Sequence, residues 1–419
     1  MNAATGWALP LILAQQPELP EFTLWLWIRW MLVLGIVFFG IFPGIVAYMV
    51  WGERKVAARF QDRIGPNRVG PFGLLQPIAD AIKLLTKENI VPRTADHFVH
   101  VLAPVLLLVS AFLVLAVIPF GVGLAAVNPP SGLLYLIAVS SASALGIFLA
   151  GWSSRNKYSL LGAMRAVAQL VSYEVPQVLS MVPIVLWTGS LSMVSIFEHQ
   201  VEFGWFIFSP PGFLAFCLLT IANIAEVNRA PFDLPEAESE IIAGYHTEYS
   251  GMRFGLFFLA EYLSVFGVSC LGTAVFLGGG TLPPPFTDFR TLITTETFAS
   301  TVLIDALLVS VFMAKVALYV FFMFWVRATL PRMRVDRLMN FAWKFMVPLS
   351  IVNILIAAVW YEFIYRPAIP QYLNGWLVTG AMVAVSVGFM IWLYKYSNRA
   401  EADPTDDSPL PRLGTVTRH

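Results

Sequence analysis

Nine long runs of apolar residues constrain this chain more than any other feature. They fall near residues 24–50, 99–121, 132–152, 167–188, 211–227, 252–279, 299–326, 341–363 and 375–396. A helix needs about 20 such residues to cross the hydrocarbon core of a bilayer. The composition is 58% hydrophobic and only 12% charged, about half the charged fraction of a soluble domain. The sequence therefore predicts an all-α, polytopic membrane helix bundle.

The distribution of basic residues predicts how these spans are oriented. Most of the 26 Lys and Arg residues fall in alternate loops, at 52–98, 153–166, 228–251 and 327–340, and after the last span. Loops rich in Lys and Arg remain in the cytoplasm. We therefore expect the N-terminal segment 1–23 to lie outside and those four loops to lie inside. The polar tail 397–419 is expected to be cytoplasmic and disordered.

The sequence offers little material for a cofactor. Cys217 and Cys270 lie in separate spans and cannot supply the four thiolates of an iron–sulfur cluster. The five histidines show no metal-binding spacing, and no Gly-rich nucleotide fingerprint is present. We expect no metal, flavin or iron–sulfur cluster in this chain. The formal net charge of zero gives no basis for nucleic-acid binding.

Carboxylates are concentrated between two of the spans, in the stretch EVNRAPFDLPEAESEIIAGYHTEYSGMRFGLFFLAE. The acids there are Glu226, Asp233, Glu236, Glu238, Glu240, Glu248 and Glu261. Glu261 lies about 14 Å into the sixth span at the rise of an α-helix, and Glu174 lies inside the fourth. Ionisable groups inside a membrane are costly and usually functional, so this pattern indicates proton or ion chemistry. For Glu236, Glu238 and Glu240, a solvated acidic loop is the simpler alternative.

Two further features lie outside that stretch. The loop 52–98 contains an amphipathic helix, with Ile78, Ile82 and Leu85 on one face and Asp80, Lys83 and Lys87 on the other. Such a helix either rests on the headgroups or forms a platform where an amphiphile enters between spans. Lys315 is a lone cation in the seventh span, which snorkels or pairs with an acid such as Asp305.

Four motifs, in order, resemble one family. They are GERKVAARFQDRIGPNRVGPFGLLQPIADAIKLLTKE, LGAMRAVAQLVSYEVP, AEVNRAPFDLPEAESEIIAGYHTEYSGMRFGLFFLAEY and RATLPRMRVDRLM. Together, across residues 25–363, they look like the H subunit of the proton-pumping NADH:quinone oxidoreductase, respiratory complex I. The resemblance implies an eight-span quinone-chamber core over 24–363. The ninth span, within 364–396, and the tail extend beyond the family pattern.

The resemblance also implies what such a protein does. Quinone, either menaquinone or ubiquinone, would enter from the bilayer and be reduced by another chain. This chain would shape the quinone path and couple reduction to proton translocation. Implied partners are the peripheral-arm quinone-site subunits, small and antiporter-like membrane subunits, and lipid. The implied location is a bacterial plasma membrane, with the N-terminus outside.

Site residues carry over motif by motif. Quinone access is implied for Glu53, Arg54, Arg63, Asp80, Lys83 and Lys87. The proton relay is implied for Glu174, Glu226, Glu261, Asp233, Glu236, Glu238, Glu240 and Lys315. A supporting role in the relay is implied for Lys157, Arg165 and Arg229.

Three other interpretations compete with this one. A stand-alone proton-coupled transporter would favour an internal inverted repeat, and none is apparent. A membrane component of a hydrogenase complex would lack quinone, against which the intact GERK and RIGPN motifs and the long acidic loop argue. A passive anchor would have no use for buried acids, which reduce stability.

Overall fold

The computed structural model describes residues 40–121, 125–233, 243–282, 298–362 and 388, with side chains in the seventh apolar run from residue 306. No strand occurs among these residues, which confirms the predicted all-α class. In chain order the helices are α3 (Phe42–Phe60), η2 (Pro71–Gly73), α4 (Gln76–Thr86), α5 (His97–Leu115), α6 (Gly132–Ser153), α7 (Lys157–Thr188), α8 (Met193–Phe203), η3 (Phe206–Phe208), α9 (Pro210–Glu226), η4 (Gly244–His246), α11 (Gly251–Phe276), α13 (Phe298–Thr329), α14 (Val335–Phe341), η5 (Ala342–Met346) and α15 (Val347–Trp360).

Six of the helices are long and apolar enough to cross a membrane. These are α5, α6, α7, α11, α13 from Ala306, and the continuous rod formed by α14, η5 and α15. The shorter α9 is also apolar. The expected spans over 99–363 thus each contain a helix, and α3 contains the end of the first. The segment 1–23, the ninth span and the tail lie outside the described residues.

Two helix boundaries differ from the sequence-based expectation. Helix α3 continues past residue 50, so Glu53 and Arg54 are helical. Helix α7 begins at Lys157, inside the segment expected as the loop 153–166. The reason is a capping residue, because Asn156 Oδ1 accepts a hydrogen bond from the Tyr158 backbone N–H at 3.0 Å.

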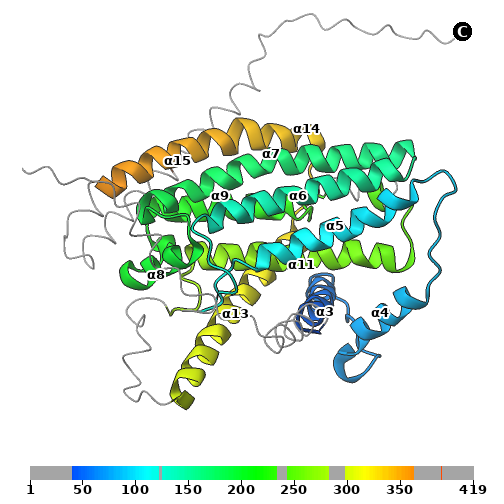
Figure 1. Ribbon diagram of the computed structural model, residues 1–419, viewed down its shortest axis with the longest axis horizontal. Coiled ribbons are helices and arrows are strands. Elements are labelled where there is room, and N and C mark those ends of the chain that lie inside the picture. The colour runs from blue at the N-terminus through cyan, green and yellow to red at the C-terminus, as the bar shows by residue number, and fades with distance from the viewer. Residues whose placement is uncertain (1–39, 122–124, 234–242, 283–297, 363–387, 389–419) are drawn as a thin grey trace, which may run out of the picture.

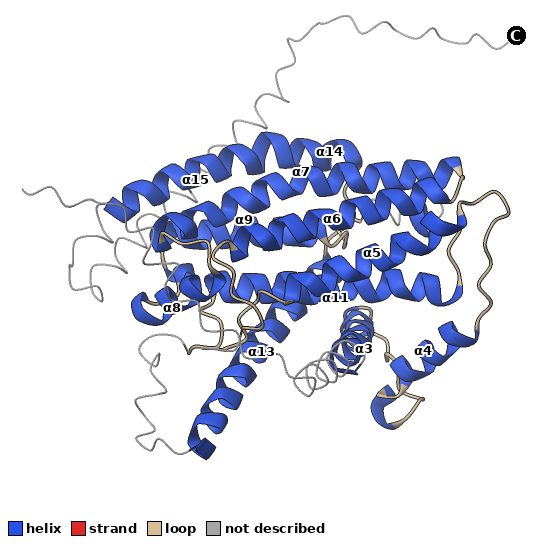
Figure 2. Cartoon of the chain, in the orientation of Figure 1, coloured by secondary structure: helices blue, strands red, loops and turns tan. Residues whose placement is uncertain are grey.

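Figures 1 and 2 show how the bundle is arranged. Helices α5, α6, α7, α11 and α15 run side by side along the long axis, α13 crosses them obliquely, and α3 is seen nearly along its own axis. Helix α4 lies at the edge, beyond α3. This arrangement packs α3, α9 and α13, which are far apart in sequence, against α11.

Small residues allow the helix backbones to approach closely. A Cβ atom on Gly151 would lie 2.3 Å from Cβ of Ala163, across the α6–α7 contact. A Cβ on Gly162 would lie 2.7 Å from Cα of Gly244. Large apolar side chains such as Leu318 and Leu355 are exposed instead. This distribution is typical of membrane bundles, where small residues line helix contacts and lipid covers the outer surface.

An aromatic enclosure surrounds His246, just before α11. The imidazole ring lies 5.1 Å from the ring of Phe257 and 5.7 Å from that of Phe254. Only 5% of the residue is exposed. Because burial disfavours the charged imidazolium, it lowers the pKa of His246 from 6.5 to about 3. The ring is therefore neutral at physiological pH and acts as part of the core.

We expect Gly162→Ala to destabilise the bundle. The new methyl group would meet the Gly244 backbone, which cannot move aside as a flexible side chain can. Overpacking of this kind costs about 1–3 kcal/mol, and thermal unfolding of the detergent-solubilised complex measures it. Gly44→Ala is the matched control, because it gains the same helix propensity and a Cβ at Gly44 has no neighbour within 4 Å. Equal unfolding temperatures for the two variants would contradict the close contact.

We also expect a pH dependence of stability that His246 causes. Below pH 6.5 the unfolded chain binds a proton at this residue, whereas the folded chain does not until the pH approaches about 3. Stability therefore falls as the pH is lowered through this window. His246→Phe should reduce that loss when unfolding temperature is measured against pH. Identical curves for wild type and His246→Phe would contradict the assignment.

Candidate functional site

Four charged side chains from four segments meet where α3, α9 and α13 pack against α11. Glu53 of α3 accepts hydrogen bonds from Arg327 of α13 and from Arg229, with Arg229 Nη1 3.4 Å from Glu53 Oε1. Arg229 Nε lies 2.8 Å from Glu261 Oε1 of α11. Glu53 is 6% and Arg229 7% exposed. We call these four residues the charge cluster. Its two carboxylates and two guanidinium groups balance, as buried charges require.

The turn after α9 places Arg229 in the cluster. Asn228 has a positive φ of 52°, which asparagine tolerates better than most residues. The buried Gln169 side chain on α7 donates to the carbonyls of Ala225 and Phe232, both at 2.7 Å. Since these two carbonyls lie on either side of Arg229, one amide fixes both ends of the turn.

A large groove lies between α3, α4 and α11. It has a volume of about 560 Å³, and its wall is mostly apolar. Charged side chains lie along its α3–α4 side, where Arg54 Nη1 is 2.7 Å from Asp80 Oδ2, and Lys83 and Lys87 are also among its lining residues. The predicted amphipathic helix is confirmed as α4, and Ile78, Ile82 and Leu85 on its apolar face are more than half exposed.

Tyr262 connects the groove to the charge cluster. Its side chain lines the groove, and the guanidinium carbon of Arg229 lies 4.4 Å from its ring centroid. Its hydroxyl also hydrogen bonds with Glu53. A molecule in the groove would thus contact a residue that directly touches two members of the cluster.

A second hollow adjoins the groove. It has a volume of about 790 Å³ and is lined by Arg63, Arg68 and the Gly65–Pro66–Asn67 turn. Arg54 lines both this hollow and the groove. Arg63 donates from Nε to Gln61 Oε1 at 2.8 Å. The basic residues of the GER and RIGPN motifs therefore lie at the groove and beside it.

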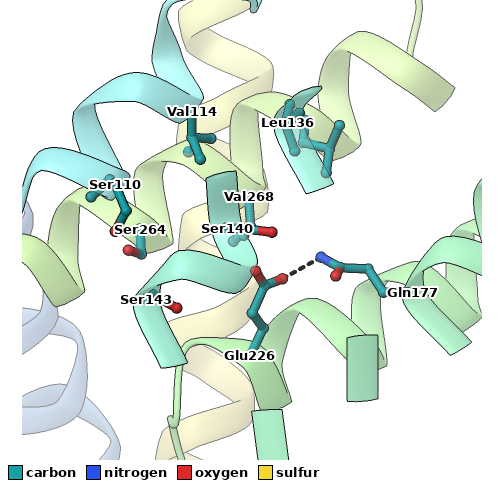
Figure 3. Close-up of a pocket in the computed structure, with 12 residues that line it drawn as sticks. Ser110, Val114, Leu136, Ser140, Ser143, Gln177, Glu226, Ser264 and Val268 are labelled. Carbon is teal, nitrogen blue, oxygen red and sulfur yellow. Dashed lines mark hydrogen bonds between the residues drawn. The ribbon is translucent and has the colours of Figure 1, made fainter. Parts of the chain in front are cut away.

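A small polar cavity surrounds Glu226, at the end of α9. It has a volume of about 40 Å³ and is lined by Ser110, Ser140, Ser143, Gln177, Glu226 and Ser264, among others. Figure 3 shows Glu226 beside Ser140, with Gln177 donating a hydrogen bond to its carboxylate. We call this space the serine cavity. A volume of this size holds about one to three water molecules.

Glu174 belongs to the same neighbourhood. It is half-buried on α7, forms a side-chain hydrogen bond with Ser141, and lies close enough to Glu226 for mutual repulsion. The serine cavity is also near the charge cluster. Ser264 follows Glu261 by one helical turn on α11, a rise of about 4.5 Å, and Arg229 follows Glu226 by three residues.

The remaining predicted residues lie elsewhere. Asp233 is half-buried, and its carboxylate lies 4.0 Å from Arg332. Lys157 is exposed at the start of α7, with its ammonium 5.2 Å from the ring of Tyr158, and Arg165 is half-buried two turns later. Neither of these two lines the groove or the serine cavity. Glu236, Glu238 and Glu240 lie outside the described residues.

Lys315 does not interact with an acid through any contact that the structure describes. Its ammonium donates to three backbone carbonyls, those of Leu277, Gly279 and Thr281, at 2.6, 2.8 and 2.5 Å. It therefore binds the end of α11 rather than the charge cluster. The side chain of Asp305, the acid considered from the sequence, lies outside the described residues.

Several site residues were missed by the sequence analysis. Gln169 and Gln177 are uncharged and lie inside a span, although Gln177 follows Glu174 by three residues and so shares its helix face. Tyr262 was overlooked beside Glu261, and Arg327 was counted only for topology. Among the described residues, no group of three or more His, Cys, Asp or Glu side chains could hold a metal ion.

Comparison with known proteins identifies the family. The pattern of the NADH dehydrogenase family matches residues 30–358. The H subunit of NADH-quinone oxidoreductase from Dehalococcoides mccartyi strain CBDB1 is 48% identical over 370 residues, which cover 88% of this chain and 96% of that protein. The protein of the same name from Brevibacillus brevis is 48% identical over 330 residues, 79% of this chain and 93% of that protein. The Geobacillus kaustophilus protein of that name is 46% identical over 327 residues, 78% of this chain and 92% of that protein.

These matches include all four motifs and every described residue of the charge cluster, the groove and the serine cavity. They rule out the interpretation as a stand-alone transporter. The chain belongs to the NADH dehydrogenase family, as an H subunit of NADH-quinone oxidoreductase, the respiratory complex I.

Proposed function

We propose that the groove between α3, α4 and α11 admits a lipid-soluble quinone and that the charge cluster senses its redox state. An apolar wall suits an isoprenoid tail, and the charged side chains along α3 and α4 suit the lipid–water interface. The position of Tyr262, which lines the groove and stacks on Arg229, supports the proposal most strongly.

The charge cluster has the composition that such a sensor needs. Arg229 interacts with both Glu53 and Glu261, so a change in charge near the groove alters the balance between its two partners. Charges about 4 Å apart interact by about 4 kcal/mol at the effective dielectric constant of a protein surface. A small fraction of that energy would be enough to shift Arg229 away from Glu261. The negative charge of Glu261 would then be less well compensated, which favours its protonation.

The serine cavity would receive this signal. The charge cluster and the cavity share one turn of α11 and the short segment from Glu226 to Arg229. A proton on Glu261 would change the field at Glu226 and Glu174, two acids that already repel each other. Water held by the four serines could then carry protons between these acids. In this scheme Glu174, Glu226 and Glu261 exchange protons, and Gln177 positions Glu226.

The arrangement also suggests how the chain fits into its complex. The side of the chain that carries Arg54, Arg63 and the segment around Asp233 would face the peripheral-arm subunits in the cytoplasm, as the positive-inside rule favours. In this proposal the same side also carries the acids Glu236, Glu238 and Glu240. Lys157 and Arg165 would support the proton relay from there. In this scheme the antiporter-like subunits of the complex, in a bacterial plasma membrane, would receive the signal from the serine cavity.

Glu261→Gln tests the coupling role. Loss of a group that gives and takes a proton slows transfer by about 10²–10⁴-fold, so proton pumping should be lost while the complex still assembles. Pumping is measured in proteoliposomes by a pH-sensitive dye, and assembly by recovery of the other subunits with the purified complex. Glu88→Gln is the control, because Glu88 is exposed at the end of α4. Normal pumping by an assembled Glu261→Gln complex would refute the role.

Arg63→Glu tests quinone access. Reversing this charge should disturb the interfacial end of the groove and lower quinone-linked turnover by about tenfold, a change in barrier of about 1.4 kcal/mol. Electron transfer from NADH to a soluble dye should be unaffected, because it does not use the groove. Arg59→Glu provides a matched charge reversal on the exposed face of α3. An equal loss in both assays for Arg63→Glu would count against the proposal.

A further inference from the structure

A hydrogen-bonded row of polar side chains leads from the serine cavity into the apolar core. Gln177 donates both to Glu226 and to Asn223 Oδ1, the latter at 3.1 Å. Asn223 in turn donates to the Tyr319 hydroxyl at 3.2 Å, and Tyr319 donates to Thr220 Oγ1 at 3.0 Å. All four side chains that follow Glu226 are buried. We call Gln177, Asn223, Tyr319 and Thr220 the polar row.

The polar row stops at a layer of aromatic rings. Thr220 donates to the carbonyl of Phe216, and the Phe216 ring lies 5.9 Å from the ring of Tyr319 and 5.8 Å from that of Phe276. Phe276 is the last residue of α11. The row thus points away from the charge cluster, toward the opposite end of the bundle, and no described residue of the proposed coupling path lies there.

Lys315 lies directly beyond this layer. It precedes Tyr319 by one helical turn on α13 and therefore lies on the same helix face. Its side chain binds the carbonyl of Leu277, the residue after Phe276. Along α13, Lys315 is about 18 Å from Arg327 of the charge cluster. It therefore lies near the middle of α13, on the far side of the aromatic layer from the charge cluster.

The surroundings of Lys315 hold it as a fixed cation. An ammonium group has three donors and no acceptor, and here the three carbonyls of Leu277, Gly279 and Thr281 accept from it. Its nitrogen also lies 3.9 Å from the ring centroid of Trp205, a favourable cation–π contact. Because a neutral amine has only two N–H donors, three carbonyl acceptors favour the protonated ammonium.

The turn that supplies these carbonyls is tightly packed. A Cβ atom on Gly278 would lie 2.2 Å from the indole nitrogen of Trp205, and one on Gly279 would lie 2.5 Å from the ring of Phe197. Gln200 accepts from the Gly278 N–H at 2.9 Å and donates to the Ala274 carbonyl at 2.8 Å. Such packing holds the three carbonyls in place around the ammonium of Lys315.

We propose that Lys315 and the turn it binds form an electrostatic barrier that stops protons from leaving the serine cavity through this chain. A fixed positive charge repels hydronium, and an aromatic layer excludes water, which are the two means by which channels block ions. The polar row gives protons a route into the core, and the barrier closes its far end. Protons that reach Glu226 are thereby retained for the neighbouring subunits. This inference rests on the proposed proton chemistry of the serine cavity.

Passive proton flux tests the barrier without any redox reaction. The whole complex is reconstituted in liposomes, a membrane potential is imposed with potassium and valinomycin, and a pH-sensitive dye inside reports proton entry in the absence of NADH. Lys315→Gln keeps amide donors for the carbonyls but removes the charge. We expect it to raise the flux by about tenfold, as for a barrier lowered by about 1.4 kcal/mol. Lys315→Met should do the same.

Three further variants separate a barrier from a merely structural role. Lys315→Arg keeps the charge and should restore a low flux. Tyr319→Phe added to Lys315→Gln breaks the polar row and should suppress the leak. A leak caused by general misfolding would persist in this double variant. Lys344→Gln, at an exposed lysine of η5, should leave the flux unchanged. A flux equal to wild type in assembled Lys315→Gln, or a leak that Tyr319→Phe does not reduce, would overturn the proposal.

Failure of the barrier and failure of the proposed coupling give different results. If Glu261→Gln pumps normally while Lys315→Gln leaks, the barrier stands and the proposed coupling through Glu261 fails. If Glu261→Gln stops pumping while Lys315→Gln does not leak, the coupling stands and the barrier fails.

Discussion

The interaction on which the rest of this structure depends is the pairing of Arg229 with the carboxylates of Glu53 and Glu261. An uncompensated buried charge would cost several kcal/mol, and Arg229 compensates both Glu53 of α3 and the partly buried Glu261 of α11. The turn after α9, the contact of Gln169 with that turn, and the approach of α13 with Arg327 all serve this arrangement. Helix packing here follows from charge compensation as much as from apolar contact.

The groove and the serine cavity are placed by the same constraint. Tyr262 next to Glu261 faces the groove, and Ser264 one turn later faces the cavity. One helix, α11, thus presents an apolar binding surface, a paired acid and a water-sized space within four residues. This membrane component of NADH-quinone oxidoreductase therefore has a short physical path along which a change in the groove could reach buried carboxylates.

Much of the fold could be predicted from the sequence, because run length and hydropathy decide which segments cross a membrane. The acids at Glu226 and Glu261 and the amphipathic helix α4 stood out for similar local reasons. The interaction partners of the site residues could not be predicted in this way. Glu53 and Arg327 are 274 residues apart in sequence, and only the packing of α3 against α13 brings them together. Gln169 and Gln177 carry no charge, and although Gln177 shares a helix face with Glu174, the roles of both depend on what the fold places opposite them.

The contact that Gln169 makes has a consequence for reading natural sequence variation in this protein. The side-chain amide of Gln169 donates hydrogen bonds to carbonyls on both sides of the turn that carries Arg229. No described contact joins Gln169 to a member of the charge cluster. A change at this neutral position would disturb an ion pair without altering the number of charges. Variants that look harmless on a substitution table can therefore produce an electrostatic defect at a distance of one turn.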